Sequence, residues 1–125
     1  MSDILVIEPG STPRRLIDYV LTRAGFAVTS VTDGAQARRV LESSTPSLAF
    51  CEVDLPDGSG LDLVAELRAA GTDYVVMLST RTRPQDREQA LAAGADDLIG
   101  KPLSPARLRT LADAHTSAAA SSVAT

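Results

Sequence analysis

Four polar residues of this 125-residue chain follow or end apolar runs and carry side chains that could act together: Glu8, Glu52, Ser79 and Lys101. They supply two carboxylates, a hydroxyl and an ammonium. A carboxylate at the end of an apolar strand is costly to bury unless another group pairs with it. Glu52, which closes the apolar run 48–51, is therefore the residue whose role most needs an explanation.

Lys101 is the only lysine of the chain, and the other eleven basic residues are all arginine. An ammonium is a compact charge with three donors, unlike the planar guanidinium group. One interpretation is that this ammonium serves a site. The other is an ordinary lysine at a strand end, whose aliphatic stem covers apolar surface. Its place directly after an apolar run favours the site.

The elements that must position these residues alternate along the chain. Apolar runs and turn residues predict strands over 4–7, 26–29, 48–53, 74–79 and 98–99, and helices over 13–24, 33–41, 59–70, 84–93 and 105–112. Repeated strand–helix units with short loops indicate a parallel sheet covered by helices on both faces. The fold class is therefore α/β, doubly wound. The strand ends share one edge, where ligand crevices form, so the four polar side chains should converge there.

Local signals mark several helix starts. Thr12 can cap the first helix, with Pro13 at its first position. Asp33 and Gln36 have the spacing of a capping box. Ser104, followed by a proline, can cap the last helix.

Composition favours one domain over residues 1–115, followed over 116–125 by a flexible tail or linker made only of Ala, Ser, Thr and Val. The net charge of −4 argues against direct binding to nucleic acid. No apolar run approaches a membrane span and no signal peptide is visible, so we expect a cytoplasmic protein. The single cysteine, Cys51, is expected to be a buried structural thiol. His115 stands alone and supports neither a metal site nor a catalytic triad, so no enzyme activity is expected.

Four stretches carry a more specific resemblance. They read ILVIEP at 4–9, EVDLPDGSGL at 52–61, GADD at 94–97 and KP at 101–102. In this order and spacing the chain resembles, from about residue 3 to 114, the receiver domain of two-component response regulators. The resemblance implies a flavodoxin-like, CheY-like (βα)5 three-layer sandwich with strand order 2-1-3-4-5. It also implies transfer of a phosphoryl group from a histidine kinase to an aspartate beside a bound magnesium ion.

The chain departs from that family at three positions. The phosphoacceptor position is Glu52 instead of Asp, and the second acid after the first strand is replaced by Pro9, next to Glu8. The position of the aromatic switch residue is Leu98. The family usually binds magnesium through the second acid, the acceptor and a backbone carbonyl, which here would be that of Asp54. Ser79 and Lys101 keep the hydroxyl and lysine positions.

These departures predict a weak magnesium site or none, because a ligand is lost to Pro9 and magnesium demands near-ideal oxygen coordination. Glu52 is one methylene longer than Asp and reaches towards Lys101. Its charge of about −1 partly mimics a phosphate of about −1.5 to −2. We therefore expect an atypical receiver that acts as a protein–protein interaction module without phosphorylation. A purely structural pairing of Glu52 with Lys101 is an equally weighted interpretation.

The sequence is also compatible with other functions and partners. A working, magnesium-dependent phosphoacceptor could use Asp54 or Glu52, while Asp54 and Asp57 are otherwise loop acids. A nucleotide-binding or catalytic domain is disfavoured, since no glycine-rich phosphate loop is present. The expected partner is a histidine kinase or an effector domain, with homodimerisation as a further alternative. Arg81, Arg83 and Arg87 are expected to form a solvated face, where an anionic partner contact is a minor alternative.

Overall fold

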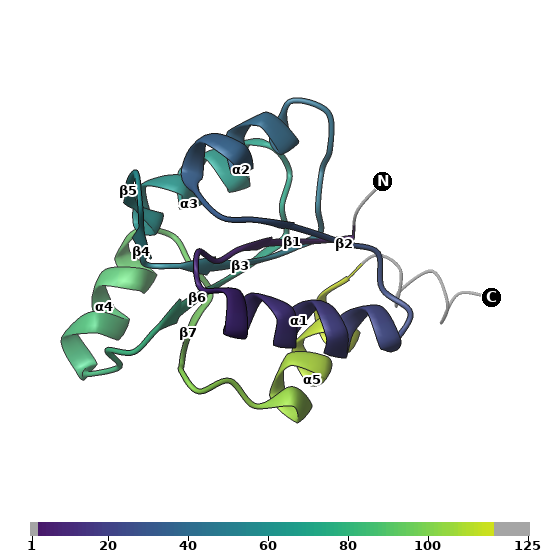
Figure 1. Ribbon diagram of the computed structural model, residues 1–125. Coiled ribbons are helices and arrows are strands. Elements are labelled where there is room, and N and C mark those ends of the chain that lie inside the picture. Colours follow the sequence, from purple (N-terminus) through teal and green to yellow (C-terminus); the bar gives the residue numbers. More distant parts are fainter. Residues whose placement is uncertain (1–2, 117–125) are drawn as a thin grey trace.

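The computed structural model describes residues 3–116. Its centre is a parallel sheet of five strands: β1 (Ile4–Ile7), β2 (Val28–Val31), β3 (Leu48–Glu52), β6 (Tyr74–Ser79) and β7 (Asp97–Gly100). Their spatial order is β2-β1-β3-β6-β7 (Figure 1). In order of the sheet strands along the chain this is 2-1-3-4-5, so the predicted doubly wound α/β fold is confirmed.

Two helical layers cover the sheet (Figure 1). On one face α1 (Ser11–Arg23) and α5 (Pro105–His115) bury Ile17, Leu21 and Leu108 against β-strand residues such as Phe50. On the other face lie α2 (Gly34–Leu41), α3 (Val64–Ala69) and α4 (Pro84–Ala92). Every residue of β3 is buried, as expected for a central strand covered on both faces.

The predicted second strand was placed two residues too early. Val28–Val31, not residues 26–29, pairs in register with Ile4–Ile7. The reason is the end of α1, where Gly25 adopts φ +97° and the Phe26 N–H donates to the Leu21 carbonyl. Phe26 thereby belongs to the helix stop, and the strand begins only after it.

Two of the three predicted helix starts are confirmed. Asp33 accepts a hydrogen bond from the Gln36 N–H, and Ser104 accepts one from the Arg107 N–H. The predicted cap at Thr12 is wrong: α1 begins at Ser11, and Gly10 is its N-cap without a side-chain cap. The Glu8 carboxylate accepts a hydrogen bond from the Gly10 N–H, which fixes the turn after β1, and the helix begins two residues earlier than expected.

A short hairpin, β4 (Asp54–Leu55) and β5 (Gly58–Ser59), replaces the loop expected after the central strand. A 3-10 turn, Gly60–Leu63, then leads into α3, so the helix itself begins at Val64. Thr116 is buried, and the rest of the predicted tail, residues 117–125, lies outside the described residues. Over residues 3–116 no helix is long and apolar enough to cross a membrane.

Candidate functional site

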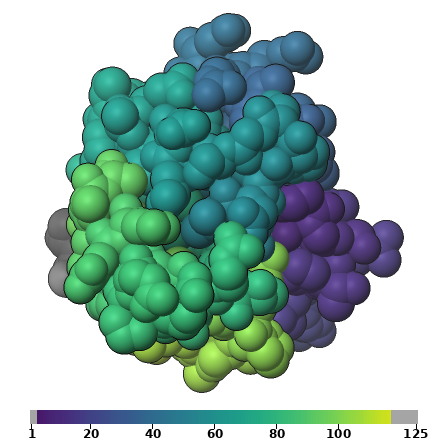
Figure 2. Space-filling model, turned by 90° about the vertical axis from the view of Figure 1, so that its left-hand side faces the viewer, coloured from purple at the N-terminus to yellow at the C-terminus, as the bar shows by residue number. Residues whose placement is uncertain are grey.

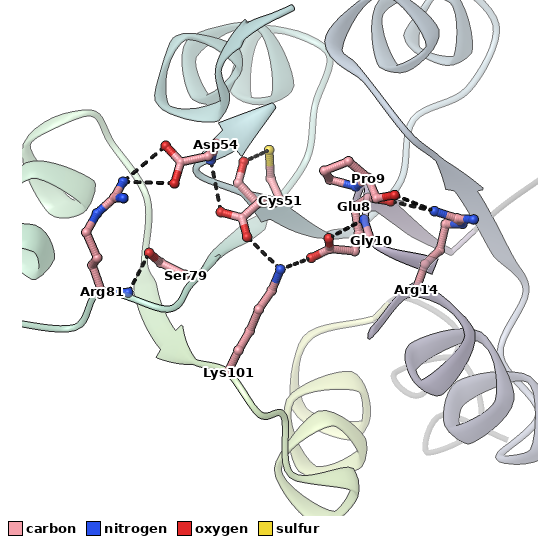
Figure 3. Close-up of polar contacts among 10 residues, drawn as sticks. Glu8, Pro9, Gly10, Arg14, Cys51, Asp54, Ser79, Arg81 and Lys101 are labelled. Carbon is pink, nitrogen blue, oxygen red and sulfur yellow. Dashed lines mark hydrogen bonds and ion pairs between the residues drawn. The ribbon is translucent and has the colours of Figure 1, made fainter. Parts of the chain in front are cut away.

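Glu8, Glu52 and Lys101 meet at the edge formed by the carboxyl ends of the strands. Figure 3 shows the side chains of Glu8 and Lys101 pointing toward each other there. Glu8 directly follows β1, Glu52 ends β3 and Lys101 directly follows β7. The Nζ atom of Lys101 lies 2.6 Å from Oε1 of Glu8 and 2.6 Å from Oε1 of Glu52. Figure 2 faces this edge, where segments from the beginning, middle and end of the chain come together. The parallel topology therefore places three of the four predicted side chains in contact.

The second oxygen of each carboxylate is held by the backbone. The Gly10 N–H donates to Oε2 of Glu8 at 2.8 Å, and the Asp54 N–H donates to Oε2 of Glu52 at 2.9 Å. All four carboxylate oxygens therefore have a donor or a cation beside them. Both carboxylates are buried, with the Glu8 side chain only 1% exposed and that of Glu52 8% exposed.

The ammonium of Lys101 responds to two opposing effects. Burial alone would lower its pKa, but the hydrogen bonds and charges of Glu52 and Glu8 outweigh burial and leave the pKa of Lys101 above its ordinary value. The lysine is therefore charged at neutral pH, and the pocket holds two carboxylates against one ammonium.

Pro9 and Arg14 shape the side of the pocket where a second acid would stand. The guanidinium of Arg14 donates to the backbone carbonyls of Glu8 and Pro9, at 3.0 and 3.1 Å (Figure 3). Pro9 adds no carboxylate to the pocket. Arg14 holds the turn after β1 through the backbone carbonyls of Glu8 and Pro9. This arrangement was not predicted, because nothing in the spacing of Arg14 distinguishes it from other helix arginines.

The side chains of Ser79 and Asp54 form no hydrogen bond with Lys101, and both are hydrogen-bonded to Arg81 instead. The Ser79 hydroxyl is buried and accepts a hydrogen bond from the Arg81 N–H at 3.0 Å. The Arg81 guanidinium reaches across to the carboxylate of Asp54, at 3.0 and 2.8 Å, on the side away from Lys101 (Figure 3). Both side chains of that ion pair are more than half exposed. The structure thus places Ser79 and Asp54 beside the central cluster, linked to each other through Arg81.

Leu98, at the aromatic switch position, is buried in the core beneath α4. It also lines the floor of a cavity of about 420 Å³ between the α4 and α5 sides of β7. An aliphatic side chain in this place fills core volume and offers no ring that could rotate.

Magnesium does not fit these residues as they stand. The ion prefers six oxygens at short, near-ideal octahedral distances. Here Oε2 of both Glu8 and Glu52 accepts a backbone hydrogen bond, and Lys101 Nζ lies 2.6 Å from Oε1 of both, although its contact with the buried Oε1 of Glu8 is an ion pair without a hydrogen bond. The carboxylate of Asp54 is held by Arg81. Within residues 3–116 no group of three or more His, Cys, Asp or Glu residues is arranged to hold a metal ion.

The sequence did not predict the contacts of two residues in the loop after β3. The carboxylate of Asp57 accepts hydrogen bonds from the N–H groups of Gly34 and Ala35, so it caps α2 and fixes the hairpin; these two bonds lower the pKa of Asp57. Gly60 passes so close to the strand end that a Cβ there would lie 2.0 Å from the Glu52 carbonyl oxygen. A turn acid before a glycine was visible in the sequence, but its distant partner was not.

The arginines expected on a solvated face are each ion-paired. Arg83 binds Asp86 within α4, and Arg87 binds Asp97 at the start of β7. Arg107 of α5 binds the other oxygen of Asp97 at 2.9 Å, and the Leu98 N–H donates to Asp97 as well. Burial of Asp97 opposes these three contacts, but together they leave its pKa below the ordinary value. Asp97 therefore joins α4 to α5 across the edge strand.

Cys51 and His115 complete the predicted residues. Cys51 is fully buried, and burial raises the pKa of its thiol to about 12, as expected of an inert structural cysteine. The ring of His115 stacks on that of Tyr74, with centroids 3.6 Å apart. His115 is therefore a packing residue at the end of α5.

Comparison with known proteins agrees with the fold. The family description "Response regulator receiver domain" matches residues 4–113. The chain is 37% identical over 123 residues to the transcriptional regulatory protein KdpE of Mycobacterium tuberculosis, covering 95% of this chain and 54% of that protein. It is 38% identical over 108 residues to the transcriptional regulatory protein GltR of Pseudomonas aeruginosa, covering 84% and 45%. The chain thus spans about half the length of these relatives.

Solved structures show the same architecture. A two-component response regulator from Clostridium difficile superposes with a TM-score of 0.85 at 25% identity, covering 91% of this chain and 94% of that one. The chemotaxis response regulator CheY4 of Vibrio cholerae gives a TM-score of 0.80 at 24% identity, covering 88% and 94%, which is a likeness of fold. The chain belongs to the response regulator receiver family.

Proposed function

We propose that this receiver domain works as a signalling interaction module whose output does not depend on an aspartyl phosphate. The observation that carries the proposal is the contact of 2.6 Å between Lys101 Nζ and Glu52 Oε1 at the family's phosphoacceptor position. A longer carboxylate there meets the lysine directly, without a phosphoryl group between them. Pro9 and Leu98 support the same proposal, because one removes an acid and the other removes the rotating ring.

The electrostatics support a partial mimic of the modified state. A phosphorylated aspartate would bring about −1.5 to −2 charges to this position, whereas Glu52 brings about −1. Its carboxylate is fixed from both sides, by Lys101 and by the Asp54 N–H. In this proposal the contact between Lys101 and Glu52 is permanent, whereas a contact with a phosphoryl group would form only after phosphorylation.

The competing function is a working phosphoacceptor through Asp54 or Glu52, with bound magnesium. Asp54 is poorly suited, because its carboxylate is mostly exposed and points to Arg81. Glu52 is better placed, but an attack on a phosphodonor would require one oxygen to leave Lys101 or the Asp54 N–H. We therefore place this function second, and we expect magnesium to bind weakly at best.

The partner proposed for this module is a protein, either a histidine kinase or an effector domain. The names of the matched relatives describe transcriptional regulators, and this chain covers only about half of each. For this domain we propose no direct contact with nucleic acid or membrane, a cytoplasmic location and no enzyme activity. A homodimer stays an alternative arrangement for the same module.

Incubation with acetyl phosphate and magnesium, followed by intact-mass measurement, tests the proposal. The wild-type chain should keep its mass, while the double variant Glu52→Asp, Pro9→Asp should gain one phosphoryl group. A phosphoryl gain by the wild-type chain that disappears in Glu52→Gln or in Asp54→Asn would establish the competing function. A folded double variant that stays unmodified would refute the assignment of the pocket.

A further inference from the structure

The two carboxylates of the pocket require a positive charge. The side chains of Glu8 and Glu52 are 1% and 8% exposed, and a buried ionised carboxylate is stable only when a cation or several donors compensate it. Backbone N–H groups satisfy one oxygen of each. The other oxygens, Oε1 of both, face the same point between β1 and β3.

One group in the described part of the chain supplies that charge. The Nζ atom of Lys101 lies 2.6 Å from both Oε1 atoms and so bridges them. Two arginines beside the pocket have other partners: Arg14 donates to backbone carbonyls and Arg81 to Asp54 (Figure 3). The bridge is also short of solvent, since the Lys101 side chain is only 17% exposed.

A divalent cation that bound both Oε1 atoms would have to displace this ammonium from them. The largely buried ammonium of Lys101 would then lose its ion pairs with Glu8 and Glu52. Pro9 gives no third carboxylate to offset that loss, and Asp54 is held on the other side by Arg81. The ammonium is attached to the chain, so it competes at a high effective concentration.

We propose that Lys101 is a built-in counter-cation, which fills the place between Glu8 and Glu52 that a divalent metal ion would otherwise take. This inference rests on the proposed function and deepens it: the site does not bind magnesium because the ammonium of Lys101 already pairs with both carboxylates. Removing the ammonium should therefore turn the same two carboxylates into a site that responds to divalent cations.

Melting temperatures of three proteins test this inference in buffer without a phosphodonor. The wild-type chain, Lys101→Met and Lys101→Arg are each titrated with MgCl2 and with NaCl at matched ionic strength. The wild type and Lys101→Arg, which keeps a cation, should show no difference between the two salts. Lys101→Met should melt lower and regain several degrees, saturably, with MgCl2 but not with NaCl.

Two results would overturn the inference: a saturable magnesium-specific rise for the wild type, or a folded Lys101→Met that responds equally to both salts. If Lys101→Met is unfolded in every buffer, the test uses the wild-type chain instead: its amide NMR signals are recorded during a titration with Mn²⁺. Selective broadening at residues 8, 52 and 101 would contradict the built-in cation, and its absence up to millimolar Mn²⁺ would support it. Magnesium binding without phosphorylation would sink this inference alone, whereas a phosphoryl gain in the mass assay would sink the proposed function.

Discussion

The Nζ atom of Lys101 lies 2.6 Å from Oε1 of Glu52, although the two residues are 49 positions apart in the chain. They end or follow strands that are not neighbours, since β6 lies between β3 and β7. The long side chains of both residues span that gap at the edge of the sheet. The ion pair, which also includes Glu8, thereby ties the strand β7 to the centre of the domain.

Removing the charge of Glu52 should cost stability. In Glu52→Gln the buried ammonium keeps only Glu8 as an anionic partner, and we expect the free energy of unfolding to fall by about 1–3 kcal/mol. Denaturant unfolding measures this. The matched control is Glu66→Gln, whose ion pair with Arg38 is about half exposed and should matter little. Equal losses in both variants would show that the buried pair has no special weight.

Gly60 should tolerate no larger residue. A Cβ at this position would lie 2.0 Å from the Glu52 carbonyl oxygen, and the backbone of β3 cannot move without disturbing the site. Gly60→Ala should destabilise the protein by about 1–3 kcal/mol, as overpacking typically does. Gly34→Ala is the control: the atom nearest to its Cβ would be a carboxylate oxygen of Asp57, 3.3 Å away, which has to move by only a few tenths of an ångström. Thermal unfolding that ranks Gly34→Ala as the worse variant would contradict the close approach.

Asp97 should make the domain sensitive to acid. Its pKa is lowered in the folded protein, so the stability that it contributes is present above the ordinary value of 3.8 and is lost as the pH falls through the folded pKa. In Asp97→Asn the free energy of unfolding should fall less steeply with decreasing pH below about 4. The measurement is denaturant unfolding at a series of pH values.

The two arginines provide the complementary test of Asp97. Arg87→Met with Arg107→Met removes both guanidinium partners and keeps the carboxylate. The pKa of Asp97, followed by NMR of its side-chain carboxyl carbon, should rise in this double variant. An unchanged titration midpoint would mean that the link between α4 and α5 does not stabilise the charged form.

Much of the fold was predictable because its signals are local. Apolar runs bounded by glycine and proline located the strands, and short connections implied parallel pairing. Parallel pairing then predicted that Glu8, Glu52, Ser79 and Lys101 would converge, because their strands end at one edge. Glu8, Glu52 and Lys101 meet there, whereas the Ser79 hydroxyl accepts a hydrogen bond from the Arg81 N–H instead. The first residue of β2 could not be predicted from the run 26–29, because an apolar residue such as Phe26 occurs both in strands and in the turn that ends a helix.

The surroundings of the site depend on distant partners, which sequence spacing does not reveal. Asp57 reads as a turn acid, yet it accepts hydrogen bonds from Gly34 and Ala35 at the start of α2, which precede it by 23 and 22 residues. Arg81 and Asp54 meet only because the loops after β6 and β3 lie side by side. Long arginine side chains can reach many acids, so which pair forms is decided by the folded arrangement.

The most direct test of the central claim uses the single lysine, whose ammonium gives one side-chain signal in an NH3+-selective NMR spectrum of the ¹⁵N-labelled protein. We predict a sharp signal for Lys101 Nζ, slow to exchange with water, which moves in Glu52→Gln and is unchanged by magnesium with acetyl phosphate. A signal broadened by rapid exchange, or one that shifts when magnesium and acetyl phosphate are added to the wild-type chain, would contradict the claim that Glu52 permanently holds this lysine.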